Sequence, residues 1–146
     1  MQNWEVVSRP TISSAAAMQL VQRCIAAAEA SNTSISVSIC DPAGGLIAFH
    51  RMDDAALVSG ELSEKKAYTA VLLGLETGKL YDFIKDKPAL AISLPHTTNF
   101  VVIEGGSPIA SAGHVIGGVG VSGGTPDQDA ACVSTALQGF GPSEMK

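Results

Sequence analysis

Charged and aromatic residues are scarce in this sequence of 146 residues. Asp, Glu, Lys and Arg together make up 16% and Phe, Trp and Tyr 5%, whereas hydrophobic residues make up 46%. The net charge of −5 and the lack of a basic cluster argue against nucleic acid as a partner, because phosphate contacts need clustered Lys and Arg. So few charges leave much surface for another subunit to cover, and we expect a homo-oligomer of at least two chains.

Long hydrophobic runs are also missing. No apolar stretch approaches the ~18 residues that a membrane-spanning helix needs. Residues 1–10 form a polar lead-in without the pattern of a secretion signal. We therefore expect a cytoplasmic protein with no membrane partner.

Cysteine is limited to three widely spaced residues, Cys24, Cys40 and Cys132. Their spacing excludes the paired motifs of zinc ribbons, thioredoxin-like enzymes and covalently attached haem. The three histidines are equally dispersed, so no pair of Cys or His residues has the spacing of zinc ligands. We predict no tightly bound zinc and no other metal site built from side chains, and we expect the cysteines to be small core residues.

The apolar pattern predicts a single domain over residues 1–146, with an ordered core from about 11 to 140. The first expected helix is capped by Thr11, Ser13 or Ser14 and runs to about residue 30; the others cover residues 57–75, 79–84 and 125–140. The expected strands cover residues 34–39, 46–52, 99–103, 109–112 and 115–122. Residues 89–98, which contain Pro95, are expected to be irregular. Consecutive hairpins imply an α/β fold of the α+β type, with a five-stranded antiparallel sheet and helices packed on both faces.

A glycine-rich segment from Gly118 to Gly123 matches the GxGxxG fingerprint of dinucleotide-binding proteins. That fingerprint joins a strand to a helix within a βαβ unit, whereas here the first two glycines fall inside a strand and only one helix follows. The segment is therefore not a dinucleotide site. Glycines inside a strand instead allow a helix, another subunit or a flat ligand to come close.

Other glycines lie at the ends of predicted elements. Gly105 and Gly106 precede a strand, and Ser122 and Gly123 lead into the closing helix. The free N–H groups at that helix start can hold an anion, although a capping box at residues 125–128 uses some of them. Packing and ligand binding are both open for these positions.

Arg51 and Asp53 stand where a strand leads towards a helix. An Arg in this place can hold a carboxylate or a propionate with two parallel hydrogen bonds. Alternatively, Asp53 or Asp54 pairs with Arg51 or caps the following helix.

Lys66 lies on the apolar stripe of its predicted helix. A cation on an apolar face is either buried against a partner or aimed into a pocket. In the first case we expect a carboxylate partner, with Asp41, Asp53 and Asp54 as candidates. In the second, Lys66 and Arg51 converge on one anion-binding spot, and their repulsion lowers the Lys66 pKa.

The histidines occupy three different settings. His50 continues a strand, His96 lies in the irregular segment, and His114 is expected to be exposed at a hairpin tip. One His beside a flat apolar slot is enough for an axial ligand of haem or a corrinoid. A plain structural role is the alternative for His50 and His96.

Five ordered motifs resemble those of the GlcG/HbpS family, which is also seen at the C-terminus of PduO proteins. The motifs are residues 40–45 (CDPAGG), 50–55 (HRMDDA), 63–70 (SEKKAYTA), 104–109 (EGGSPI) and 115–124 (VIGGVGVSGG), the last followed by Gln128-Asp129. The resemblance implies a profilin-like fold and assembly into dimers or larger rings such as octamers. It also implies a link to haem, corrinoids or redox sensing, the properties described for family members.

The first functional hypothesis is a binding module for haem, a corrinoid or a small organic acid. Arg51 and Lys66 face anionic groups of the ligand, and Gly106, Ser122 and Gly123 line its slot. The remaining residues of the expected ligand-binding set are His50, Asp53 and Gly105.

The second hypothesis is a small enzyme without a cofactor, acting on a catabolic carboxylic acid by proton abstraction or elimination. Lys66 is then the base, Arg51 anchors the carboxylate, and the amides of Gly123 and Gly124 stabilise an oxyanion. The sequence alone does not decide between the two hypotheses.

Overall fold

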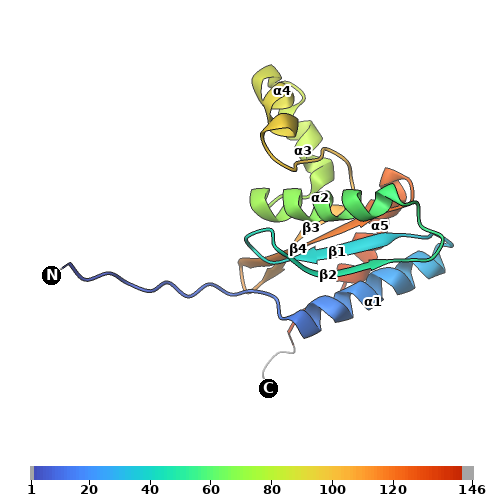
Figure 1. Cartoon of the computed structure of the whole chain (residues 1–146), viewed down its shortest axis with the longest axis horizontal. Helices are drawn as coiled ribbons and strands as arrows, with labels where there is room; N and C mark the ends of the chain where they lie inside the picture. The colour runs from blue at the N-terminus through green and yellow to red at the C-terminus, as the bar shows by residue number, and fades with distance from the viewer. Residues whose placement is uncertain (1, 143–146) are drawn as a thin grey trace.

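The computed structural model describes residues 2–142 and contains helices on two sides of one sheet (Figure 1). The elements in chain order are α1 (Ser14–Ala30), β1 (Ser36–Cys40), β2 (Leu46–Arg51), α2 (Val58–Leu73), α3 (Thr77–Ile84), α4 (Pro88–Thr97), β3 (Gly106–Ser111), β4 (His114–Ser122) and α5 (Pro126–Leu137). Within the described residues, no helix has the length and apolar character needed to cross a membrane.

Helices α1 and α5 begin at capping residues. The Ser13 side chain accepts a hydrogen bond from the Ala16 N–H at the start of α1. Thr125 and Gln128 form the expected capping box at the start of α5, and each satisfies a backbone N–H of the other. Helix α5 ends at residue 137, earlier than the predicted 140, because Gln138 is extended.

The four strands form one antiparallel sheet in the order β2-β1-β4-β3. Helices α1 and α5 cover one face, and α2 covers the other (Figure 1). The antiparallel sheet with helices on both faces is thus confirmed. The predicted fifth strand, however, is wrong.

The segment expected to be that fifth strand, residues 99–103, packs on α2 instead of pairing with the sheet. Its Val101 N–H donates to the Thr69 hydroxyl at 3.0 Å, and the Phe100 ring lies 6.0 Å from the Tyr68 ring. The neighbouring edge of β3 has few free backbone N–H groups for a further strand. The Gly106 N–H donates to the Thr77 Oγ1 at 2.9 Å, and Pro108 has no N–H.

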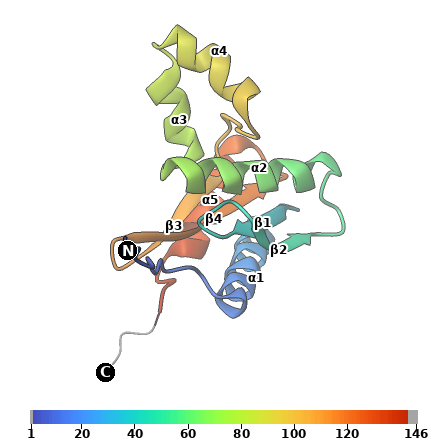
Figure 2. The ribbon, with the colours of Figure 1, turned by 60° about the vertical axis from the view of Figure 1, so that its left-hand side comes forward.

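A further helix, α4, occupies the region expected to be irregular. Pro88 is its first residue, where the missing N–H costs no helical hydrogen bond. Pro95 is tolerated near the other end, where it lies two residues before the helix stops. Helices α3 and α4 project away from the sheet as a pair, and no residue of α4 is buried (Figure 2).

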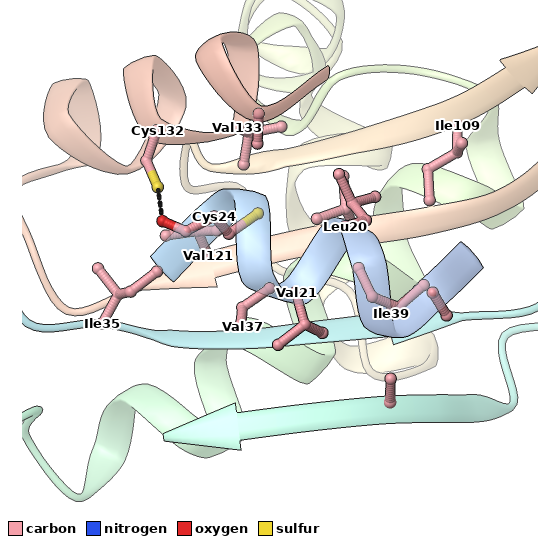
Figure 3. Packing of buried hydrophobic residues seen from close by; sticks show 14 of the residues in the cluster. Leu20, Val21, Cys24, Ile35, Val37, Ile39, Ile109, Val121, Cys132 and Val133 are labelled. Atoms are coloured by element: carbon pink, nitrogen blue, oxygen red, sulfur yellow. Dashed lines mark hydrogen bonds between the residues drawn. The ribbon is translucent and has the colours of Figure 1, made fainter. Parts of the chain in front are cut away.

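The face covered by α1 and α5 carries the main hydrophobic core (Figure 3). Alternate residues of the central strands, including Val37 and Val121, point at Leu20 and Cys24 of α1 and are fully buried. All three cysteines are buried, as the sequence predicted. Burial raises the pKa of the Cys40 thiol to about 12, so that it stays protonated at neutral pH.

On the opposite face, α2 lies directly against the backbone of β4. A Cβ atom at Gly120 would stand 2.0 Å from the Ser63 carbonyl oxygen, and one at Gly118 would stand 2.6 Å from the Ala67 carbonyl oxygen. No side chain fits between the two elements at these positions. The glycines of the false nucleotide motif therefore serve the packing of a helix on the sheet.

We predict that Gly120→Ala destabilises the fold by about 3 kcal/mol or more, the upper end of overpacking, because the obstructing atom belongs to the backbone of α2. Chemical denaturation measures this change. Gly141→Ala is the control, since a Cβ there meets nothing within 4 Å; it should stay within ~0.5 kcal/mol of the parent. Equal stability of the two variants would contradict the close packing.

Candidate functional site

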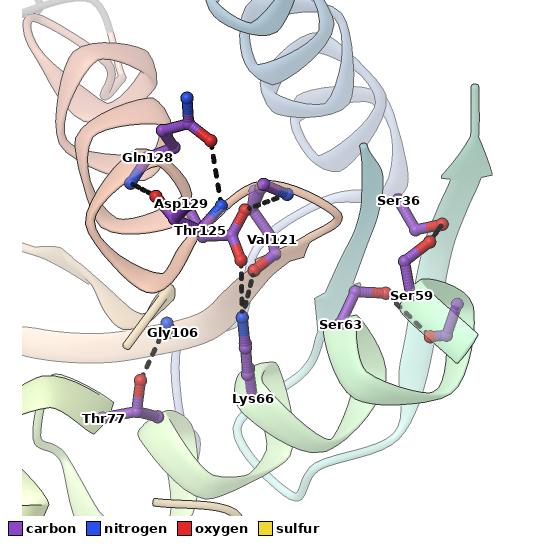
Figure 4. Close-up of polar contacts among 12 residues, drawn as sticks. Ser36, Ser59, Ser63, Lys66, Thr77, Gly106, Val121, Thr125, Gln128 and Asp129 are labelled. Carbon is purple, nitrogen blue, oxygen red and sulfur yellow. Dashed lines mark hydrogen bonds and ion pairs between the residues drawn. The ribbon is translucent and has the colours of Figure 1, made fainter. Parts of the chain in front are cut away.

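An ion pair is buried where α2, β4 and α5 meet (Figure 4). The Lys66 Nζ lies 2.9 Å from the Asp129 Oδ2 and donates a second hydrogen bond, also 2.9 Å long, to the Val121 carbonyl oxygen. Lys66 is 1% exposed and Asp129 2%. Lys66 is therefore held inside the fold and does not project into an open pocket.

Asp129 is the partner of Lys66, and it is none of the three carboxylates suggested by the sequence. Burial lowers the Lys66 pKa from its ordinary value, while the hydrogen bond and the charge of Asp129 counteract this. The expected lowering of the pKa is present, but desolvation causes it in place of a neighbouring Arg51. An ammonium group without solvent access is poorly placed to take a proton from a substrate.

Asp129 also holds the loop that leads into α5. Its Oδ1 accepts the Gly124 N–H at 2.9 Å, and the Gln128 Oε1 accepts the Thr125 N–H at 2.9 Å. The Gly124 amide was one of the two oxyanion candidates, and the Asp129 carboxylate occupies it. The Thr125 amide at the helix start is occupied by Gln128. Ser122, at the end of β4, is buried.

Two further polar pairs join α2 to the sheet. The hydroxyl groups of Ser36 and Ser59 lie 2.8 Å apart, and those of Ser38 and Ser63 lie 2.7 Å apart (Figure 4). All four residues are buried. The α2 face of the sheet thus combines bare backbone, paired hydroxyls and one ion pair.

A first cleft, of about 680 Å³, lies between the start of α3, the edge of β3 and α5. Gly105 and Gly106 line it together with Glu76, Lys79 and Glu104. Gly105 has a φ of +116° and lies over the buried pair, since a Cβ there would stand 3.0 Å from the Lys66 Nζ. The structure thus brings Gly105, Gly106 and Lys66 together, with Lys66 beneath the glycines.

His50, Arg51 and Asp53, also expected at the site, lie on or just after β2, the edge of the sheet opposite to β3. Arg51 and His50 are exposed on β2, and Asp53 is exposed just after it. Arg51 pairs in register with Ser36, while His50 pairs with Val37, so their side chains point to opposite faces. Arg51 and Lys66 do not form the expected joint anion-binding spot, because Lys66 is sealed beneath Gly105.

A second cleft, of about 520 Å³, lies between the start of α1, the β3–β4 hairpin and residues 140–142. Its lining residues include Ile109, Ile116, Phe140 and His114. Among the described lining residues, none is an Asp, Glu, Lys or Arg. This cleft therefore pairs one imidazole with a mostly apolar surface.

His114 was not among the site residues expected from the sequence, although the signal for its position is local. Ala112 and Gly113 both have positive φ values, +48° and +79°, which makes a tight two-residue hairpin turn. His114 is the first residue of β4 after that turn. The sequence gives the hairpin, but it does not show that α1 and the C-terminal segment enclose a cleft beside it.

No group of three or more His, Cys, Asp or Glu side chains within residues 2–142 is arranged to hold a metal ion. The prediction that no zinc binds tightly is a matter for elemental analysis.

Comparison with known proteins places the chain in a family. Residues 12–138 match the family described as haem-degrading protein HbpS-like, and the chain belongs to this HbpS-like family. A 15.0 kDa protein from the dhaT-dhaS intergenic region of Citrobacter freundii is 38% identical over 131 residues, which cover 89% of this chain and 92% of that protein. The GlcG protein of Escherichia coli is 36% identical over 65% of this chain and 69% of its own length.

PduO, a corrinoid adenosyltransferase of Salmonella typhimurium, is 38% identical over 82% of this chain, but the match spans only 36% of that longer protein. Solved structures agree in fold. The Klebsiella pneumoniae protein ORFY superimposes with a TM-score of 0.87 at 29% identity, over 100% of both chains. PduOC in complex with haem superimposes with a TM-score of 0.79 at 33% identity, over 88% of this chain and 94% of that one.

We predict that Lys66→Met lowers the free energy of unfolding by ~3–5 kcal/mol, because Asp129 is left buried without its partner. Lys65→Met is the matched control. Lys65 is the next residue of α2 and pairs with Glu61 on the surface, where such pairs contribute ~1 kcal/mol or less. Adding Asp129→Asn to Lys66→Met should recover part of the loss. A Lys66→Met protein that melts at the parent temperature would contradict this role.

Proposed function

We propose that this protein binds haem in the second cleft, with His114 as the axial ligand of the iron. The observation that carries the proposal is the position of His114 among the residues that line a cleft with apolar walls. A haem site needs one such ligand beside a flat apolar surface. Haem would supply the iron chemistry, while the chain supplies the imidazole, the walls and the partial exclusion of water.

The size and chemistry of the second cleft support this choice. Its volume of about 520 Å³ is within the ~300–1,000 Å³ of ordinary ligand sites. The tight turn at Ala112 and Gly113 restricts the backbone that carries His114, so little flexibility is lost when the imidazole binds. The haem complex of the related PduOC shows that a protein of this fold takes haem.

The first cleft suits haem less well. Glu76 and Glu104 face it with only Lys79 as a counter-charge, and Lys79 already pairs with Glu76 at 3.2 Å. Haem carries two negative propionates, which those carboxylates would repel. None of its lining residues is a His, Cys, Met or Tyr that could ligate iron.

Two other ligands expected from the sequence, a corrinoid and a small organic acid, fit the clefts to different degrees. A corrinoid could use the same imidazole, and PduO is a corrinoid enzyme by name. A small organic acid lacks an obvious cation in either cleft other than Lys79. We also propose a cytoplasmic homo-oligomer, which the apolar composition supports.

Haem titration of the purified protein tests the proposal. The parent protein should give a sharpened, red-shifted Soret band, and His114→Ala should weaken binding by at least tenfold. Loss of even a hydrogen-bond partner of a metal ligand costs about 10–100-fold in affinity.

His96→Ala and His50→Ala are the matched controls, because both histidines are exposed and neither lines this cleft. Both controls should bind haem like the parent. If His114→Ala binds haem with the parent's spectrum and affinity, His114 is not the ligand. Loss of binding in His50→Ala alone would place the site on β2.

A further inference from the structure

The N-terminal segment, residues 2–9, is an extended arm that leaves the body of the protein (Figure 1). Every residue of the arm is exposed. Trp4 is 84% exposed, Val6 79% and Val7 69%. Among residues 2–142, the first backbone hydrogen bond from this end of the chain is at the base of the arm, where the Ile12 N–H donates to the Ile116 carbonyl oxygen at 2.8 Å.

Such an arm has the composition of a strand that lacks a sheet. Trp and Val favour extended, half-buried positions, and residues 4 and 6 fall on one face of an extended chain. Three large apolar side chains in water lose the stabilisation that burial would give them. The arm makes no backbone hydrogen bond to the remaining described residues before Ile12.

The sheet has two edges, and they differ in what they can accept. On β3, the Gly105 carbonyl accepts the Val121 N–H, so the backbone groups of the alternate residues Gly106 and Pro108 point outward. The Gly106 N–H is taken by Thr77, and Pro108 has none. This edge is closed to a further strand.

The edge at β2 is open. The Met52 N–H donates to the Ile35 carbonyl, so the alternate residues Phe49 and Arg51 direct their backbone groups away from β1. Within residues 2–142, no backbone hydrogen bond reaches them. Phe49 is 45% exposed, which leaves an aromatic side chain beside the free edge.

We propose that the arm of one copy of this chain adds as a strand to the β2 edge of a second copy. The arm supplies backbone donors and acceptors for the open edge, and Trp4 or Val6 packs beside Phe49. Fully extended, residues 2–9 span roughly 26–29 Å, which exceeds the roughly 20 Å of a six-residue strand. The arm points away from its own sheet (Figure 1), so it can contact the sheet of another copy.

The single tryptophan makes this docking directly measurable, because Trp4 is the only one in the chain. Its fluorescence emission should be blue-shifted in the oligomer and move to the red on dilution, in step with the mass from light scattering. Adding an excess of Trp4→Phe protein to dilute parent protein should restore the blue shift. That variant is silent at the tryptophan wavelength but still offers its β2 edge.

Two substitutions test the two sides of the contact. Val6→Ser on the arm and Phe49→Ser on β2 should each weaken self-association by at least about tenfold, given the apolar area that each removes. Phe83→Ser on α3 is the matched control, since Phe83 is 53% exposed and lies away from the sheet. It should leave the emission and the mass unchanged.

Three results would overturn the proposal. An emission maximum that stays red at all concentrations would mean that the arm does not dock. A blue-shifted maximum that is independent of concentration would mean that the arm folds onto its own chain. A loss of docking in Phe83→Ser but not in Phe49→Ser would place the arm on the α3–α4 pair.

Discussion

Where α2 crosses β4, two backbones meet with no side chain between them. Gly118 and Gly120 make this contact possible, and it sets the height of α2 above the sheet. At that height the side chain of Lys66 reaches past β4 to Asp129 on α5. One close contact on the α2 face therefore also places a polar link to α5, which belongs to the opposite layer and packs there with α1.

The two faces of the sheet are stabilised by different interactions. The α1–α5 face is apolar, and its stability comes from buried area. The α2 face is crossed by paired serines and one ion pair, which add little net energy but penalise any other arrangement through unpaired polar groups. Such a face favours a unique position of α2 more than it adds to overall stability.

The sequence predicted what depends on local chemistry. The cap at Thr125 and the two hairpins follow from residue type and short spacing. The sequence left three candidates for the cap of α1, and it left packing and ligand binding both open for the glycines. The partner of Lys66 could not be predicted. Asp129 lies 63 residues further along the chain, and hydrophobic periodicity does not show which distant segments come into contact. For the same reason, the sequence wrongly predicted a fifth strand and did not reveal the cleft at His114. Each depends on a contact between segments far apart in the sequence, such as the hydrogen bond of Thr77 at the edge of β3.

The proline in β3 has a consequence for how this protein behaves when it is crowded. In a cross-β fibril, each strand forms backbone hydrogen bonds with a strand on either side, so both of its edges must be free to pair. Pro108 and the Thr77 hydroxyl close one edge of the sheet to a further strand, because Pro108 has no N–H and the Gly106 N–H is already hydrogen-bonded. The fold itself therefore protects the β3 edge against continued strand addition. This protection is insensitive to salt because it does not rely on charge repulsion.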